Sequence, residues 1–95
     1  MKGAKGRRKP AAGWLARISV GLKADVLDPQ GKVVREAAHD LGFRGVTDVR
    51  VGKHLWIRLN GSLSRPAADQ AVRKLANQLL INPVIETFDL ALRRG

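Results

Sequence analysis

The fold of this chain follows largely from one stretch, residues 14–42, which reads WLARISVGLKADVLDPQGKVVREAAHDLG. Apolar and polar side chains alternate over residues 14–22, the period-two pattern of a half-buried strand. Asp28-Pro29 then marks a helix start, because the Asp carboxylate can accept a free backbone N–H and proline has none to leave unpaired. Gly42 marks the end of that helix. The helix carries one apolar stripe, which we expect to face the core: Val33, Val34, Ala37, Ala38 and Leu41.

A hairpin is expected directly after this helix. Val49 and Val51 point one way in an extended segment, and alternate residues of 55–59 continue the pattern after Gly52-Lys53. Glycine at the first of two loop positions suits a type II′ turn, whose twist matches that of the flanking strands. The sequence therefore predicts two antiparallel strands joined at Gly52.

A second amphipathic helix follows, from Ser64 to Asn82-Pro83, and a last strand covers residues 84–92. The buried stripe that we expect on this second helix comprises Ala68, Ala71, Val72, Leu75, Leu79 and Leu80. Both helices are apolar along one stripe and each strand is apolar on one face. The order β-α-β-β-α-β therefore predicts an α+β, ferredoxin-like sandwich, a four-stranded antiparallel sheet with two helices on one face.

The length and the charge distribution of the chain indicate one domain with a basic tail. With 95 residues it forms one domain, which we place at residues 13–95. Residues 1–12 are expected to be a basic, disordered tail that supplies about half of the net charge of +10. The sequence has no cysteine and no apolar run long enough to span a bilayer, so a reducing compartment, the cytoplasm, is expected.

The face of the predicted sheet that no helix covers offers a clue to function. Its apolar members and one neighbouring cation form a candidate self-association face: Leu15, Trp56, Arg58 and Ile85. Tryptophan is enriched at the centres of protein interfaces, which favours a partner surface. The alternative is an RNA-binding ferredoxin-like module that uses the basic tail and Trp56. RNA-recognition sheets stack bases on two or three aromatic side chains, whereas Trp56 has only His54 beside it here.

The search for catalytic chemistry yields no candidate. The two histidines, His39 and His54, have no acids at metal-ligand spacing. The segment before Lys53 lacks the first glycine of a phosphate-binding loop, and the loop after the first strand lacks the arginine of small acylphosphatases. From its residues alone the chain is a small interaction domain, and we expect it to bind no cofactor or metal and to be no enzyme by itself.

Three blocks of sequence resemble one known family. They are Val26-Leu27-Asp28-Pro29-Gln30-Gly31-Lys32, Val49-Arg50-Val51-Gly52-Lys53, and Leu79-Leu80-Ile81-Asn82-Pro83-Val84-Ile85-Glu86. With the lengths between them they cover about residues 14–92 and resemble PurS, the small subunit of phosphoribosylformylglycinamidine synthase. The motif residues that the resemblance implies at partner contacts are Asp28, Pro29, Gln30, Gly31, Arg50, Gly52, Lys53, Asn82 and Glu86.

The resemblance also implies a role in de novo purine biosynthesis. PurS-like proteins form homodimers or dimers of dimers and bridge a synthetase (PurL) and a glutaminase (PurQ), helping ammonia to pass between them. The complex, a C–N ligase, uses ATP and magnesium, and neither a membrane nor a nucleic acid is an expected partner. Glu86 has the strand parity of core residues, so we expect either that a bulge redirects it or that it meets a cation or a backbone donor.

Overall fold

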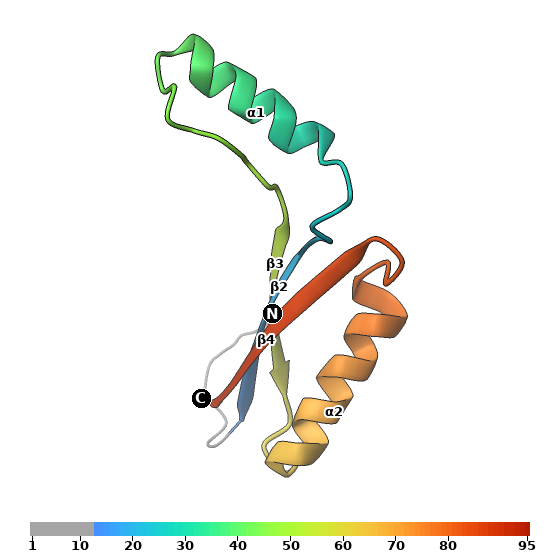
Figure 1. Cartoon of the computed structure of the whole chain (residues 1–95). Coiled ribbons are helices and arrows are strands. Elements are labelled where there is room, and N and C mark those ends of the chain that lie inside the picture. Colours follow the sequence, from blue (N-terminus) through green and yellow to red (C-terminus); the bar gives the residue numbers. More distant parts are fainter. Residues whose placement is uncertain (1–12) are drawn as a thin grey trace.

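The computed structural model describes residues 13–95, an α+β arrangement of two helices and one antiparallel sheet (Figure 1). The sheet contains β2 (Trp14–Leu22), β3 (Lys53–Leu59) and β4 (Glu86–Arg94), and β2 lies between the other two. Helix α1 (Pro29–Asp40) follows β2, and helix α2 (Arg65–Leu75) continues into a π-helical turn, η1 (Ala76–Leu80). The expected tail at residues 1–12 lies outside the described residues.

The core lies between the sheet and α2. Alternate residues of β2, including Ile18 and Val20, point toward the helix, and Ile18 pairs with Leu55 on one side and Leu90 on the other. From α2 and η1, Val72 and Ala76 meet them and are fully buried. The cluster is aliphatic, with Phe88 packed at its margin, as the low aromatic content of 4% requires.

A tryptophan closes this core at the start of β2. Trp14 is only 3% exposed, and its indole N–H donates to the carbonyl oxygen of Leu63 at 2.9 Å. The guanidinium of Arg94 lies 3.8 Å from the centre of the ring, a cation–π contact. The indole thereby ties the loop before α2 to the two strands that pair at this end of the sheet.

Helix α2 confirms the predicted start and one predicted ion pair. The Ser64 hydroxyl accepts from the backbone N–H of Ala67 at 3.2 Å, and Arg73 pairs with Asp69 at 2.9 Å. The predicted stripe is wrong at Ala71 and at Leu79, both exposed, the latter by 72%. Leu79 lies in the π-helical turn, where Ile81 donates to Ala76 at 3.0 Å, so the α-helical spacing behind the predicted stripe does not apply there.

Helix α1 departs most from the prediction. It does not pack on the sheet but lies beyond one end of it, and the whole molecule extends over 50 × 29 × 21 Å (Figure 1). The predicted burial of its apolar stripe is therefore wrong within one chain: Val33 is 64% exposed and Leu41 is 76% exposed. The helix does begin and end as predicted, with Asp28 as its N-cap and Gly42 at a φ of 98°.

The predicted hairpin is also wrong in the described chain. Residues 46–51 form no strand, and the chain runs straight on through Gly52 into β3, so the sheet has three strands rather than four. Gly52 does not adopt a positive φ. It is needed for a different reason: a Cβ at this position would clash with the carbonyl oxygen of Val20 on the neighbouring strand.

The four residues of the candidate self-association face do not form one exposed patch. Leu15 is 2% exposed, whereas Trp56 is 62% exposed. Arg58 pairs in register with Leu15 and donates to the carbonyl oxygen of Gly95 at 3.1 Å. Ile85 lies in the turn before β4, at the opposite end of β2. Among residues 13–95 no helix is long and apolar enough to cross a bilayer.

Candidate functional site: a pocket at the base of the arm

The side chain of Asp28 joins two segments that are distant in the sequence. Its Oδ1 accepts from the backbone N–H of Gly31 at 2.8 Å, and its Oδ2 accepts from the backbone N–H of Val51 at 2.7 Å. The residue Asp28 is 6% exposed. The hydrogen bonds from Gly31 and Val51, assisted by the charge of Arg50, hold the pKa of Asp28 below its ordinary value. Asp28 therefore caps α1 and at the same time binds the segment that leads into β3.

A glycine allows the two segments to approach. A Cβ on Gly31 would clash with the carbonyl oxygen of Val49, so no other residue fits between the first turn of α1 and the returning chain. Further along, the ring of His39 lies within hydrogen-bonding distance of the Val46 carbonyl, with Nε2 2.6 Å from the oxygen. Residues 28–51 thus form one unit of a helix and a returning extended segment, called the arm below.

The base of the arm is also tied to the loop after β2. Arg50 Nη2 donates to the carbonyl oxygens of Lys23 and Val26, both at 2.9 Å. The backbone N–H of Lys23 in turn donates to the carbonyl oxygen of Ile85 at 2.8 Å. These contacts fix how the arm leaves the sheet, and they occupy one of the family-motif residues, Arg50, in holding that geometry.

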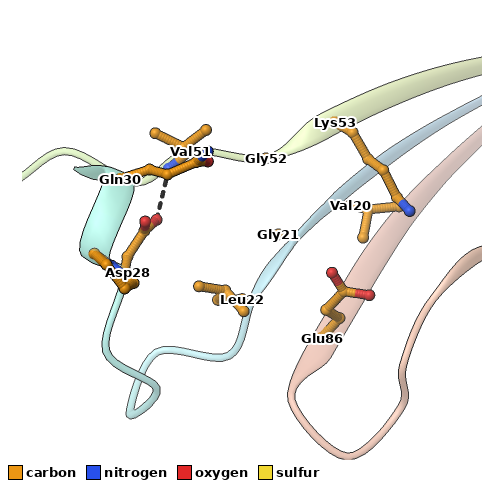
Figure 2. A pocket seen from close by; sticks show the side chains of 10 residues that line it. Val20, Gly21, Leu22, Asp28, Gln30, Val51, Gly52, Lys53 and Glu86 are labelled. Carbon is orange, nitrogen blue, oxygen red and sulfur yellow. Dashed lines mark hydrogen bonds between the residues drawn. The ribbon is translucent and has the colours of Figure 1, made fainter. Parts of the chain in front are cut away.

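A pocket of about 350 Å³ lies where the arm meets the sheet (Figure 2). The ends of all three strands and the first residues of α1 contribute to it. Its lining consists of Val20, Gly21, Leu22, Asp28, Pro29, Gln30, Val51, Gly52, Lys53 and Glu86. It is open to solvent on one side, and its floor is the apolar end of β2.

The charged groups of this pocket come from the two outer strands. Lys53 of β3 and Glu86 of β4 extend from either side of Val20, and their charged ends face the same space (Figure 2). Glu86 Oε1 accepts from the backbone N–H of Asn82 at 2.7 Å, which provides the backbone donor expected for this carboxylate. Within the described chain the ammonium of Lys53 and the amide of Gln30 have no hydrogen-bond partner, so both are available to a ligand or a partner protein.

The structure brings most of the predicted motif residues together. Six of them line the pocket, namely Asp28, Pro29, Gln30, Gly52, Lys53 and Glu86. Gly31 lies behind it against Val49, Arg50 holds the loop after β2, and Asn82 holds Glu86. Sequence reasoning missed the end of β2, residues 20–22, because a strand end without polar side chains carries no chemical signal.

The pocket offers binding groups rather than a catalytic pair. Both oxygens of Asp28 are already occupied by backbone donors. Across residues 13–95 no group of three His, Cys, Asp or Glu residues could hold a metal ion. An unpaired cation, an amide and a half-satisfied carboxylate around an apolar floor suit recognition of a polar partner. The fold and the site together define a small α+β binding subunit.

Comparison with known proteins gives this subunit its family. Residues 15–94 match the family model PurS, described as phosphoribosylformylglycinamidine (FGAM) synthase. The chain is 38% identical over 75 residues to the phosphoribosylformylglycinamidine synthase subunit PurS of Bacillus subtilis, covering 79% of this chain and 87% of that protein. It is 39% identical over 72 residues to the corresponding subunit of Synechocystis, covering 76% and 71%. The chain therefore belongs to the PurS family, whose members are subunits of FGAM synthase in purine biosynthesis.

Solved structures share the shape as well as the sequence. The PurS structure from Bacillus subtilis superimposes with a TM-score of 0.71 at 35% identity, over 84% of this chain and 98% of that one. The structure of PurLQS from Thermotoga maritima gives a TM-score of 0.75 at 24% identity and so supports the fold alone. The superposition on the Bacillus subtilis structure covers 84% of this chain. It therefore includes residues of the arm, because the sheet and α2 alone make up a smaller part of the chain.

The contact between Gly31 and Val49 leads to a first prediction. Gly31→Ala places a methyl group against a backbone oxygen, so we expect it to lower the free energy of unfolding by about 1–3 kcal/mol, as overpacking does. Gly45→Ala is the matched control, since nothing lies within 4 Å of a Cβ there. Chemical denaturation of both variants makes the comparison. Equal stability of the two would contradict the close approach.

The carboxylate of Asp28 leads to a second prediction, on pH. Because its pKa in the folded chain is lowered, its contribution to stability is present above the pKa of an unfolded Asp, about 3.9, and is lost as pH falls through the folded value. Asp28→Asn removes the titrating group. We expect the free energy of unfolding to fall less steeply below about pH 4 in this variant than in the wild type. Parallel curves from urea titrations between about pH 7 and about pH 2.5 would contradict the assignment.

Proposed function

We propose that this chain is the non-catalytic small subunit of phosphoribosylformylglycinamidine synthase, which bridges a synthetase subunit and a glutaminase subunit and assists the transfer of ammonia. The observation that carries the proposal is the match to PurS over residues 15–94, with residues from each of the three motif blocks lining the pocket at the base of the arm. The relatives carry that subunit's name, and a protein of the same fold was solved in PurLQS from Thermotoga maritima.

The proposed reaction belongs to the whole complex. The glutaminase hydrolyses glutamine and releases ammonia. The synthetase uses ATP, with magnesium, to phosphorylate the formamide oxygen of formylglycinamide ribonucleotide, and ammonia then displaces that oxygen as phosphate to give the amidine. Ammonia that escapes into water is protonated and is no longer a nucleophile. A scaffold that holds the two active sites in a fixed relative position therefore reduces the loss of ammonia. This chain supplies the scaffold and no catalytic group.

The residues that we assign to contact with the partner enzymes are Gln30, Lys53 and Glu86. Their polar ends surround the pocket at the base of the arm, and two of them have no partner within residues 13–95. The other motif residues build the site: Asp28 and Gly31 join α1 to the returning chain, and Asn82 orients Glu86. Of the three, Glu86 is held in place by a hydrogen bond, whereas the ends of Lys53 and Gln30 are unpaired and can bond to a polar partner.

We further propose that the subunit works in the cytoplasm as a homodimer or a dimer of dimers. The exposed apolar stripe of α1 supports self-association, and a cysteine-free sequence fits a reducing compartment. In that oligomer we expect the four-stranded, ferredoxin-like sandwich to be complete.

Reconstitution tests the proposed function. Synthetase and glutaminase are assayed for glutamine-dependent amidine synthesis with and without this chain, and we expect synthesis to depend on it. Synthesis driven by added ammonium salt should need the chain much less, because free ammonia bypasses the transfer. Equal glutamine-dependent activity in its absence would overturn the proposal.

A substitution in the pocket gives a further prediction. Lys53→Ala removes a cation that has no partner within the described residues, so the fold should be kept while glutamine-dependent synthesis at limiting subunit falls about tenfold, the loss produced by about 1.4 kcal/mol of binding free energy. Lys74→Ala on the exposed side of α2 removes the same charge elsewhere and should leave activity unchanged. The assignment fails if the two variants behave alike.

A further inference from the structure

The face of the sheet opposite α2, called the outer face below, carries its own set of side chains. Successive residues of a strand point to opposite faces, so Lys53 faces the pocket at the base of the arm and His54 points away from it. Of the two helices in residues 13–95, α2 covers the other face and α1 lies beyond the end of the sheet (Figure 1). The register across β3, β2 and β4 places three rows on the outer face: His54–Ser19–Asp89, Trp56–Arg17–Ala91 and Arg58–Leu15–Arg93.

Trp56 is the exposed aromatic side chain in the middle row. It is 62% exposed, and among the described residues its ring meets only that of His54, edge-on at 6.1 Å between centroids. Nδ1 of His54 lies 3.1 Å from the hydroxyl of Ser19 on β2. Arg17 lies opposite Trp56 in the register, and Arg58 is two residues further along β3 on the same face. Tryptophan and arginine are the residues that most often carry the binding energy of protein interfaces, so the outer face has the composition of an interface centre.

The outer face is also basic. Arg17, Arg58 and Arg93 are exposed, and Asp89 is the one acid that the three rows contain. Arg58 donates one N–H to the carbonyl oxygen of Gly95 at 3.1 Å, which leaves its other N–H groups available. Within residues 13–95 the guanidinium groups of Arg17 and Arg93 have no hydrogen bond or ion pair. Three cations beside an exposed tryptophan are therefore available to an anionic partner.

This chain does not itself offer the complementary surface. It contains 18 Lys and Arg residues against 8 Asp and Glu residues. Two copies placed outer face to outer face would bring like charges together, which is unfavourable. The carbonyl oxygen of Gly13 accepts from the N–H of Gly95 at 2.8 Å, so the sequence before Gly13 joins the sheet at the end that carries Arg58 and Arg93. That sequence adds only cations, namely Lys2, Lys5, Arg7, Arg8 and Lys9.

A nucleic acid is anionic too, but the aromatic side chains are not placed for one. Sheets that bind RNA stack two or three bases on aromatic side chains of their central strands. Here the central strand β2 presents Leu15, Arg17 and Ser19 on the outer face, and Trp56 belongs to β3 at the edge of the sheet. One tryptophan among arginines fits an acidic protein surface better than a run of bases.

We propose that the outer face is a docking surface for an acidic patch on one of the two partner enzymes, with Trp56 at its centre and Arg17 and Arg58 beside it. The inference rests on the proposed function, in which this chain bridges two enzymes. A bridge needs two separate contact surfaces. The pocket at the base of the arm and the outer face lie on opposite faces of one sheet, so one partner enzyme binds at each.

Substitutions on the outer face test the docking surface. Titrating the chain into synthetase and glutaminase gives the concentration needed for half-maximal glutamine-dependent synthesis. We expect Trp56→Ala to raise that concentration about thirtyfold, the loss that truncation of an interface hot spot produces. The double variant Arg17→Glu/Arg58→Glu should raise it at least as much, because repulsion replaces attraction. Lys74→Glu on the exposed side of α2 is the matched charge reversal and should leave it unchanged. Outer-face variants that keep their fold and behave like Lys74→Glu would overturn the proposal.

The salt dependence of assembly gives a second test, in which the unaltered chain is the reference. Attraction between exposed charges is screened by salt, so the half-maximal concentration of the wild-type chain should rise between about 50 mM and about 300 mM NaCl. The rise should be smaller in a variant that lacks the cations of the outer face, Arg17→Ala/Arg58→Ala. Equal salt dependence of the two chains would show that these arginines do not meet an acidic surface, and would overturn the proposal.

A nucleic acid as the true partner would give a different result. Fluorescence anisotropy of labelled poly(U) RNA measures its binding to the wild-type chain and to Trp56→Ala. We expect the substitution to leave any poly(U) binding unchanged, because the cations alone attract the phosphates. Binding of poly(U) that is lost in Trp56→Ala, together with unchanged synthesis in the titration, would assign the outer face to nucleic acid and overturn the proposal.

Failure of this inference can be told apart from failure of the proposed function. If the wild-type chain supports glutamine-dependent synthesis and the outer-face variants support it equally well, only the docking surface is wrong. If the wild-type chain does not support synthesis at any concentration, the proposed function is wrong and the docking surface falls with it.

Discussion

The two hydrogen bonds of the Asp28 carboxylate are the constraint on which the rest of the structure depends. One bond starts α1 and the other binds the chain that leads into β3, so a single side chain joins the beginning and the end of the arm. With Gly31 against Val49, the arm becomes one unit rather than a helix on a loose loop. The same junction forms one wall of the pocket, so the position of Gln30 relative to Lys53 is set there too.

This constraint divides the chain into a part with a core and a part without one. The sheet and α2 enclose a small aliphatic cluster around Ile18 and Val72, whereas the arm has capping and backbone contacts but little burial. A chain of 95 residues can bury only a modest core, and here much of its length lies outside that core. Stability of the whole molecule should therefore depend on what covers the arm, and a second copy makes it depend on protein concentration.

Local signals in the sequence predicted local structure well. Asp28-Pro29, Ser64 and Gly42 mark helix ends in the structure as they do in the sequence, and the alternation over residues 14–22 gives the central strand. The hairpin at Gly52 was predicted wrongly. In a sequence, a glycine required for the close approach to the Val20 carbonyl cannot be distinguished from a glycine required for a turn. Sequence patterns also could not show whether the stripe on α1 meets its own sheet, since an apolar face specifies a complementary surface and not the chain that provides it. The motif residues were found through family resemblance, and only the structure showed that six of them share one pocket.

We expect the four-stranded sheet to be complete only in the homo-oligomer, and amide hydrogen exchange over the segment before β3 measures this most directly. Within one chain the backbone N–H groups of residues 47–50 have no hydrogen-bond partner among the described residues. In the homo-oligomer that we propose, with its four-stranded sheet complete, alternate members of that segment donate to a neighbouring strand. The account predicts slow exchange at those alternate amides in concentrated protein and its loss on dilution to the monomer. Fast exchange at all four positions in a sample that is dimeric would contradict it.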